Sequence, residues 1–512
     1  MRSRKMIISC VIVTLGILLL YLPSTRNEAM LCGEQEKKEA GYLDELNYLF
    51  YHARYSETSR DLIPVVIWLS GGPGCSSMIG AIFENGPCMY DEETRRFHPN
   101  PFSWSNAAHL IYIDQPYGTG FSKRKLVPLR SWNNQIAAEH LRKFIESFFR
   151  LHSELQKSSL YIFGESYAGH FVPDIAVHLL NSDMTRWSPV LKGIAIGNGF
   201  VSARAIMSSY VEYSRHNDYH VDFLASEAES LEQNLLGCID FINDCMPFMT
   251  SEHRNCADAT VCSEAENKVW QAITKSGKNY YDLRRTCSIE DSSGLCYEFD
   301  ALQSLMNKPS VRTYFRSNGA QTWRVCNEEV YRDGASADFF QESEYEVAHL
   351  LNSGVRVLVY AGDADAVCNW VAQYNWTQNL EWKHSDSFRR SRTNNWMIDG
   401  AIAGTFRSSY NLTFVRVKNA GHVSDAYQKR MYPNHSMIDG PSRSTQSSTT
   451  SSGELHHGFR SEQSIKTVVF NQKVHNGCYP KQTSHRLDNY TIAKSVHATH
   501  NKTALESSTK KS

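Results

Sequence analysis

Residues 164–169 read Gly-Glu-Ser-Tyr-Ala-Gly and place a serine between small residues. A short apolar run at 160–163 precedes this stretch, and a helix-like segment follows it at 171–180. A Gly-x-Ser-x-Gly turn between a strand and a helix is a nucleophile elbow, because its small residues allow a sharp bend that exposes the serine oxygen. The match is close but not strict, since Ala168 stands before the second glycine. Ser166 is therefore a candidate nucleophile for acyl transfer.

Acyl transfer by a serine also needs a base to take its proton and an acid to hold that base. With a nucleophile elbow, the order along the chain is Ser, then Asp, then His. Asp363 and Asp365 follow an apolar run at 355–360, and His422 follows a last apolar run at 412–417. The sequence thus predicts that an aspartate and His422 meet Ser166 at one edge of a sheet.

The apolar run at 63–69 is continuous, as in a parallel strand that is covered on both faces. It leads into Ser-Gly-Gly-Pro-Gly-Cys-Ser-Ser at 70–77. Two glycines directly after a strand let backbone N–H groups point into a site, and this is one position of an oxyanion donor in hydrolases with such an elbow.

Further elements must hold these groups. Strand-like runs also occur at 109–114 and 191–196, and residues 134–151 form an amphipathic helix. We expect its apolar face to contain the residues Ile136, Leu141, Phe144, Ile145, Phe148 and Leu151. Strands that alternate with helices predict an α/β protein with a central, mainly parallel sheet and the α/β-hydrolase fold. Its core would comprise residues 40–200 and 328–430.

Residues 201–327 lack this alternation of strand-like runs and helices, and they contain a cluster of six cysteines. The cluster consists of Cys238, Cys245, Cys256, Cys262, Cys287 and Cys296. It has neither paired Cys-x-x-Cys units nor nearby histidines, which favours disulfides over zinc. We interpret this stretch as a disulfide-rich helical cap inserted into the core; the pairing within the cluster stays open.

Three features of the sequence indicate the secretory pathway. Residues 1–23 combine basic residues with an apolar run, which favours a cleaved signal peptide over a signal anchor. The chain has 13 cysteines, many for a cytosolic enzyme. Acceptor sequons for N-glycosylation lie at Asn375, Asn411, Asn434, Asn489 and Asn501. Residues 431–512 are Ser/Thr-rich in part and predict a disordered, glycosylated tail.

A formal net charge of -1 gives no reason to expect a nucleic acid as partner. A membrane is expected as a partner only if the N-terminal segment stays uncleaved. No pattern suggests a metal or a cofactor. A homodimer is one oligomeric state that the sequence leaves open.

The motifs together resemble the serine carboxypeptidases, the family of the carboxypeptidase Y, cathepsin A and fungal pheromone-processing types. The matching blocks lie at 68–77, 114–116, 118–122, 164–169, 197–199, 360–370 and 420–422. The resemblance covers roughly residues 40 to 424. It implies a serine-type carboxypeptidase that releases C-terminal amino acids from peptides or proteins through an acyl-enzyme.

The resemblance also implies residue roles. The catalytic residues would be Ser166, Asp365 and His422, with the backbone N–H groups of Gly72 and Tyr167 as oxyanion donors. The peptide's terminal carboxylate would be held by Trp68, Ser70, Glu84 and Glu165. Cys75 would pair with Cys326, and Cys368 would be the unpaired thiol near the site.

Two glutamates that hold a carboxylate must share a proton, because like charges in a shielded pocket cannot all stay ionised. This predicts better activity in acid and favours a vacuole, a lysosome or the extracellular space over the Golgi. Two departures from the family pattern matter: Ser70 replaces an asparagine, and Val-Ser-Asp follows His422 in place of Met-Val-Pro. The alternatives are an acyltransferase on the same scaffold and a catalytically impaired member or binding protein.

Overall fold

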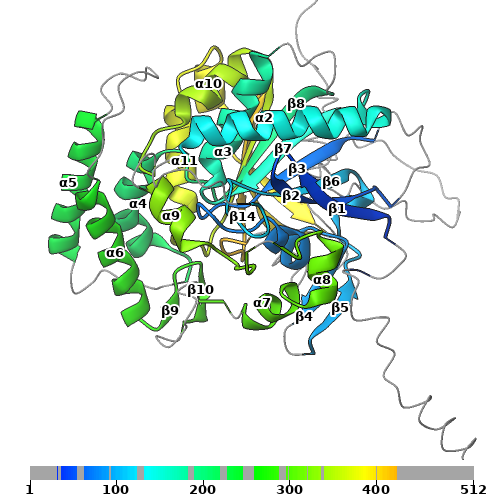
Figure 1. Cartoon of the computed structure of the whole chain (residues 1–512). Helices are drawn as coiled ribbons and strands as arrows, with labels where there is room; N and C mark the ends of the chain where they lie inside the picture. Colours follow the sequence, from blue (N-terminus) through cyan, green and yellow to red (C-terminus); the bar gives the residue numbers. More distant parts are fainter. Residues whose placement is uncertain are drawn as a thin grey trace, which may run out of the picture. The chain divides into compact units, whose positions relative to one another are not determined.

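Ten strands form one central sheet in a computed structural model of the chain (Figure 1). The structure describes residues 32, 36–54, 63–91, 94–123, 132–182, 189–219, 228–245, 259–287, 296–297, 299–319, 321–335, 339–398 and 400–423. The strand order is β1-β2-β6-β3-β7-β8-β11-β14-β13-β12. The strands are β1 (Lys38–Leu43), β2 (Leu46–Tyr51), β3 (Val65–Leu69), β6 (His109–Asp114), β7 (Ser159–Glu165), β8 (Val190–Gly197), β11 (Arg356–Gly362), β12 (Asn394–Ile398), β13 (Ala401–Ser409) and β14 (Leu412–Val417).

The six central strands from β6 to β14 pair in parallel, and antiparallel strands close both edges. The prediction of an α/β-hydrolase fold with a mainly parallel sheet is therefore confirmed. Parallel strands end at a common edge of the sheet. Each of the candidate catalytic groups follows one of these carboxyl ends.

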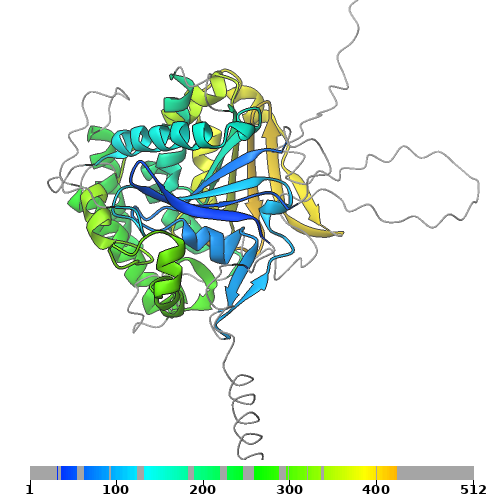
Figure 2. The same cartoon turned by 45° about the vertical axis from the view of Figure 1, so that its right-hand side comes forward.

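Alternate residues of β3 enter two different cores, one on each face of the sheet. Val65, Ile67 and Leu69 pack with α2 (Asn134–Leu151), α3 (Ala168–Leu180), α10 (Glu344–Asn352) and α11 (Trp370–Asn379). Val66 and Trp68 pack on the other face with η2 (Gly80–Glu84), α7 (Asp300–Met306) and α8 (Pro309–Tyr314). This explains why the run at 63–69 is apolar without alternation. Figure 2 shows the sheet from a second direction.

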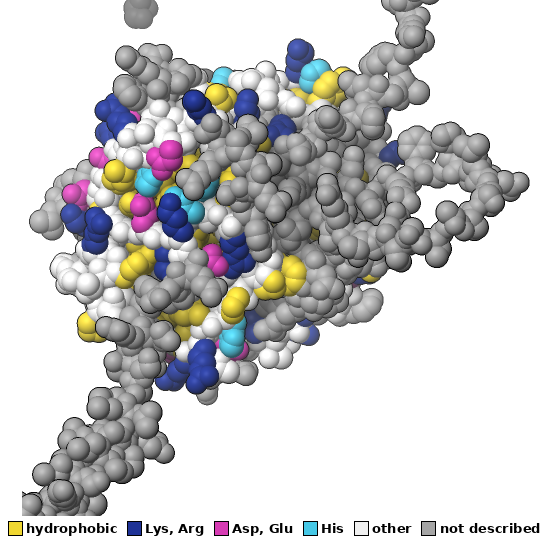
Figure 3. Space-filling model, turned by 90° about the vertical axis from the view of Figure 1, so that its right-hand side faces the viewer, with side chains coloured by type: hydrophobic (Ala, Val, Ile, Leu, Met, Phe, Trp, Pro, Cys, Tyr) yellow, Lys and Arg dark blue, Asp and Glu magenta, His cyan; other side chains and the backbone are white. Residues whose placement is uncertain are grey.

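Remaining short elements lie in the connections. They are β4 (Cys88–Asp91), β5 (Arg96–Pro99), η3 (Trp104–Asn106), η4 (Ser153–Leu155), α9 (Glu328–Ala335) and α12 (Ser385–Arg390). On the face shown in Figure 3, basic, acidic, histidine and apolar side chains are interspersed.

Two details differ from the sequence predictions. Ile136 and Leu151 of α2 are 38% and 61% exposed, so they do not belong to its buried face. Ile136 lies about 120° around the helix from the buried Phe148, and Leu151 is the last residue of the helix. The antiparallel strands β13 and β12 beyond β14 were not predicted, because a sequence such as Asn-Asn-Trp-Met-Ile in β12 lacks a regular apolar pattern.

The stretch 201–327 contains α4 (Ala203–His216), α5 (Ala228–Cys245), α6 (Thr260–Lys275), β9 (Lys278–Asn279), β10 (Asp282–Thr286), α7 and α8. Disulfides join Cys238 to Cys262 and Cys287 to Cys296 within it. Cys256 lies outside the described residues, and so does the Cys245 side chain. The stretch is thus helical and disulfide-bonded, while its exact domain boundaries stay predictions.

The predicted signal at 1–23 lies outside the described residues, and so does all of the predicted tail at 431–512, with Asn434, Asn489 and Asn501. Asn411 occupies the turn between β13 and β14, and Asn375 lies within α11. Among the residues that are described, no helix combines the length and apolar character needed to cross a bilayer.

Candidate active site

Ser166 occupies a tight turn between β7 and α3. Its φ angle of 62° lies in the left-handed region, which non-glycine residues rarely adopt. Three backbone hydrogen bonds fix this conformation: the Ser166 N–H donates to Gly197 O at 3.1 Å, and Ser166 O accepts from Gly169 N at 2.9 Å and Phe200 N at 2.8 Å. Strain of this kind holds a side chain in one direction and is typical of functional sites. The turn has the strand–turn–helix geometry that the sequence predicts for a nucleophile elbow.

Asp365 and His422 are paired, although 57 positions separate them in the chain. His422 Nδ1 lies 2.8 Å from Asp365 Oδ2, and both residues are buried. Asp365 also accepts from Asn198 Nδ2 at 2.8 Å and from the N–H groups of Val367 at 2.9 Å and Cys368 at 3.2 Å. A carboxylate with donors on both oxygens keeps one orientation, so it can hold the imidazole with Nε2 directed away from it.

Asp363, the other aspartate that the sequence offers, has a different set of partners. Its Oδ1 accepts from the Tyr219 hydroxyl at 2.5 Å and from the Asn419 N–H at 2.8 Å, and Arg416 lies 3.5 Å from its Oδ2. Burial raises the pKa of Asp363. The structure therefore gives Asp365 the contact with His422 and leaves Asp363 to hold the loop that carries His422.

Ser166, Asp365 and His422 follow β7, β11 and β14, which all run in the same direction in the sheet. Asn198, directly after β8, holds the loop that follows β11, because it accepts from the Gly362 N–H at 3.1 Å and donates to Asp365. Within the part of the chain that the structure describes, Ser166 Oγ makes no hydrogen bond. Its contact with the His422 imidazole stays a prediction; such bonds are often long until substrate is bound.

The glycine turn after β3 lies directly against the nucleophile elbow. A Cβ on Gly71 would come within 2.4 Å of Tyr167 N and 2.7 Å of Ser166 Cβ. The next residue, Gly72, has a φ angle of +106° and precedes a cis peptide bond to Pro73. Gly72 and Tyr167 thus come from two chain segments that touch beside Ser166, which is the arrangement needed for two oxyanion donors.

Gly71→Ala is expected to lower kcat about 100-fold, because the new methyl group must separate the two segments that would form the oxyanion hole. Gly319→Ala is the matched control, since a Cβ on Gly319 meets nothing within 4 Å. Steady-state kinetics with a chromogenic peptide would check this. Equal kcat values for the two variants would contradict it.

The loop after β3 is also held from the neighbouring strand by Asp114, which is fully buried at the end of β6. Its Oδ1 accepts from Ser76 Oγ at 2.5 Å and Ser77 N at 3.1 Å, and its Oδ2 accepts from Phe121 N at 2.9 Å. Burial raises the pKa of Asp114 to about 6. The carboxyl group therefore joins the two loops that follow β3 and β6.

The four predicted carboxylate ligands are all buried and come from neighbouring elements. Leu69 of β3 pairs with Gly164 of β7, so Ser70 and Glu165 follow side by side at the end of the sheet. Trp68 Nε1 donates to Ser70 Oγ at 3.3 Å, and a Cβ on Gly80 of η2 would lie 2.2 Å from the same nitrogen. Glu84 is the last residue of η2 and is 1% exposed. Because Ser70 Oγ accepts from Trp68, its own hydrogen can donate to a further acceptor.

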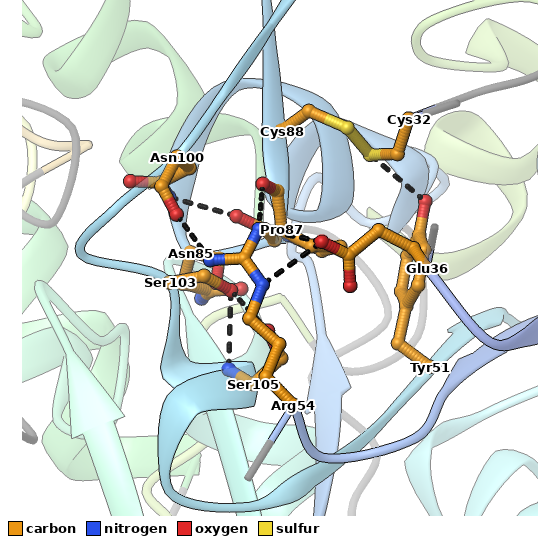
Figure 4. The surroundings of a disulfide bond; sticks show 11 residues. Cys32, Glu36, Tyr51, Arg54, Asn85, Pro87, Cys88, Asn100, Ser103 and Ser105 are labelled. Carbon is orange, nitrogen blue, oxygen red and sulfur yellow. Dashed lines mark hydrogen bonds and ion pairs between the residues drawn. A yellow bond between two sulfur atoms is a disulfide. The ribbon is translucent and has the colours of Figure 1, made fainter. Parts of the chain in front are cut away.

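Arg54 secures the loop that follows Glu84 and was not recognised from the sequence (Figure 4). Its guanidinium donates to Asn100 O at 2.6 Å and Pro87 O at 2.5 Å and forms an ion pair with Glu36 at 2.8 Å. A disulfide between Cys32 and Cys88 joins the same loop to the N-terminal part of the described chain. An isolated arginine before a polar stretch carries no signal of such a role.

Cys75 and Cys326 form a disulfide that links the glycine turn to the end of the cap stretch. Cys368 is a buried free thiol one turn from Asp365. Burial, together with the charge of Asp365, raises the pKa of the Cys368 thiol. This environment disfavours the thiolate, which is the nucleophilic form of cysteine.

A parallel sheet with a serine elbow and an Asp–His pair at its carboxyl edge defines an α/β-hydrolase. Within that class, the chain belongs to the serine carboxypeptidase family, whose model matches residues 31–438. It is thus a hydrolase that acts on peptide bonds.

Similarity to known proteins supports this assignment. The chain is 34% identical over 382 residues to serine carboxypeptidase-like 47 of Arabidopsis thaliana. The matched region covers 73% of this chain and 71% of that protein. It is 32% identical over 405 residues to carboxypeptidase Y of Komagataella phaffii, and this match covers 78% of this chain and 75% of that protein. A prohormone-processing carboxypeptidase from Saccharomyces cerevisiae has the same fold, with a TM-score of 0.65 at 23% identity over 79% of this chain and 93% of that one.

Proposed function

We propose that the protein removes single amino acids from the carboxyl ends of peptides through an acyl-enzyme on Ser166. The observation that carries this proposal is the 2.8 Å contact between Asp365 and His422 in loops that share an edge of the sheet with the serine elbow. The names of the relatives, which are carboxypeptidases, support the choice of an exopeptidase.

In this mechanism, Ser166 Oγ attacks the last peptide carbonyl while His422 Nε2 takes its proton. Asp365 accepts from Nδ1–H, keeps the imidazole in the right tautomer and stabilises the imidazolium that forms. The N–H groups of Gly72 and Tyr167 stabilise the oxyanion, and the adjacent N-terminus of α3 adds to this field. His422 then returns the proton to the leaving amine, and water releases the shortened peptide by the same steps in reverse.

Specificity for a free carboxyl end comes from Glu84, Glu165 and Ser70 in this proposal. A protonated glutamate and the Ser70 hydroxyl donate to the terminal carboxylate, and Trp68 orients Ser70. Buried donors of this kind reject a substrate that lacks the matching group. An amidated C-terminus would leave them unmatched.

This arrangement makes substrate binding dependent on pH. Donation requires one glutamate to be protonated, so binding is present in acid and is lost as pH rises and both groups ionise. We expect KM for a free-acid peptide to rise about tenfold or more from acidic to neutral solution. Glu84→Gln keeps a neutral donor and should flatten this rise, whereas Glu232→Gln, an exposed change on α5, should not. An unchanged pH profile in Glu84→Gln would contradict the assignment.

The test of the function is a panel of peptides with free or amidated carboxyl ends, followed by mass spectrometry at pH 5. We expect stepwise loss of single residues from free ends only. Cleavage of amidated peptides at internal bonds would overturn the exopeptidase assignment. Ester products formed with an added alcohol in preference to hydrolysis would identify an acyltransferase. Absence of both turnover and fluorophosphonate labelling would identify a catalytically impaired protein.

Among the described residues, four disulfides are formed, as in proteins that fold in the oxidising secretory pathway. A preference for acid suits a vacuole, a lysosome or an acidic extracellular medium as the place of action. Immunolocalisation of the tagged protein would test this.

A further inference from the structure

We propose that residues 280–284 of the cap stretch position the Asp365–His422 pair, and that Arg284 is the positioning residue for His422. The inference rests on the proposed function, because it assumes that this pair serves Ser166. The segment precedes and includes the start of β10, and nothing in its sequence pattern marks it as part of the site.

On one side, the segment holds the histidine directly. The His422 N–H donates to Tyr281 O at 2.7 Å, and the ring centroids of these two residues lie 4.9 Å apart. A Cβ on Gly421 would lie 2.7 Å from Tyr281 O and 2.9 Å from Asp282 Cβ. The loop that carries His422 is therefore pressed against the cap stretch without space for a side chain at position 421.

On the other side, the same segment bonds the loop that carries the aspartate. Leu283 N donates to Ala364 O at 2.9 Å, and Ala366 N donates to Tyr280 O at 3.0 Å. These two bonds flank Asp365 on both sides. One five-residue segment thus sets the distance between the two loops whose side chains must meet.

Arg284 connects this segment to the start of the histidine loop. Its Nε and Nη2 donate to the two oxygens of Asp282, each at 2.7 Å, and its Nη1 donates to Asn419 O. Asp282 is fully buried, so the bidentate pair fixes the direction of the guanidinium. Asn419 has a φ angle of 54°, and its N–H is bound to Asp363 at 2.8 Å. The N–H of Asn419 is thus bound by the core through Asp363, and its carbonyl is bound by the cap stretch through Arg284.

A disulfide lies just beyond the segment, three residues after Arg284. Cys287 pairs with Cys296, and Asn279 Nδ2 donates to Cys296 O at 2.9 Å. Residues just before and just after the segment are therefore both bound to Cys296, one by a hydrogen bond and the other by a covalent bond, which suits a rigid support for catalytic side chains.

The test compares Arg284→Ala with Arg285→Ala, which removes the same charge from the next, exposed residue. We expect Arg284→Ala to lower kcat about 10- to 100-fold with KM unchanged, because misplacing a catalytic group by about 1 Å has an effect of this size. Arg285→Ala should keep wild-type kcat. The downfield proton NMR signal of His422 Nδ1–H, assigned by its loss in His422→Ala, should broaden in Arg284→Ala alone.

A wild-type kcat and a sharp Nδ1–H signal in Arg284→Ala would overturn the inference. If the alanine variant fails to fold, Arg284→Lys, which retains one donor but not the fork, carries the test with an expected loss of about tenfold. Activity that survives in Ser166→Ala would instead overturn the proposed function, so the two failures are distinguishable.

Discussion

Ser166→Ala is expected to reduce kcat on a free-acid peptide by about 10⁴-fold or more, because no acyl-enzyme can form without the hydroxyl. The fold should be retained, since the elbow is held by backbone hydrogen bonds of Ser166 that alanine also makes. Steady-state kinetics and circular dichroism would measure both quantities.

Ser182→Ala is a suitable control, because Ser182 follows the opposite end of α3 and its hydroxyl donates to Leu179 O at 3.0 Å. This variant should have wild-type kcat. Turnover in Ser166→Ala that exceeds the level of a triad knockout would show that another residue performs the chemistry.

In alkaline solution, Glu266→Gln is expected to raise the free energy of unfolding above that of the wild type by up to about 5 kcal/mol. Glu266 lies on α6, is 4% exposed, and has a carboxyl oxygen that is fully buried without a hydrogen bond among the described residues. This burial raises the pKa of Glu266 from 4.5 to about 8. A raised pKa means that the folded state favours the protonated form. The stabilisation of the folded state by protonated Glu266 is fully present below pH 4.5 and is lost as pH rises through about 8.

Glutamine has nothing to ionise, so stability of the variant should depend less on pH. Melting temperatures at pH 5 and pH 9 would measure this, with Glu264→Gln as the control, because Glu264 is exposed on the same helix. The wild type and Glu264→Gln should both melt at lower temperature at pH 9. An equal decrease in Glu266→Gln would show that Glu266 is not the group responsible. Burial raises the pKa of Asp114 to about 6, so the ionisation of Asp114 also lowers the stability of the fold as pH rises, but at lower pH than that of Glu266.

The sheet could be predicted from the sequence because its parallel strands are buried on both faces and therefore appear as continuous apolar runs. The run at 412–417 is β14, and the run at 191–196 lies within β8, which extends one residue further at each end. The edge strand β12 and its neighbour β13 were not predicted, because their sequences contain polar residues and lack this pattern.

The candidate catalytic residues could be predicted because each stands just after a strand in the order that the fold requires. Asn198, which joins Asp365 to the end of β8, stood in a recognised motif but without a role. The carbonyl of Tyr281 and the fork of Arg284 could not be predicted, because backbone groups have no sequence signature and the contacts join segments more than 130 positions apart.

The arrangement of the disulfides has a consequence for proteolysis. A single cut anywhere between Cys238 and Cys262 would leave two pieces joined by both the Cys238–Cys262 and the Cys75–Cys326 bonds. Such a nicked molecule would migrate as one band on a non-reducing gel and as two after reduction, with Ser166 on one polypeptide and Asp365 and His422 on the other.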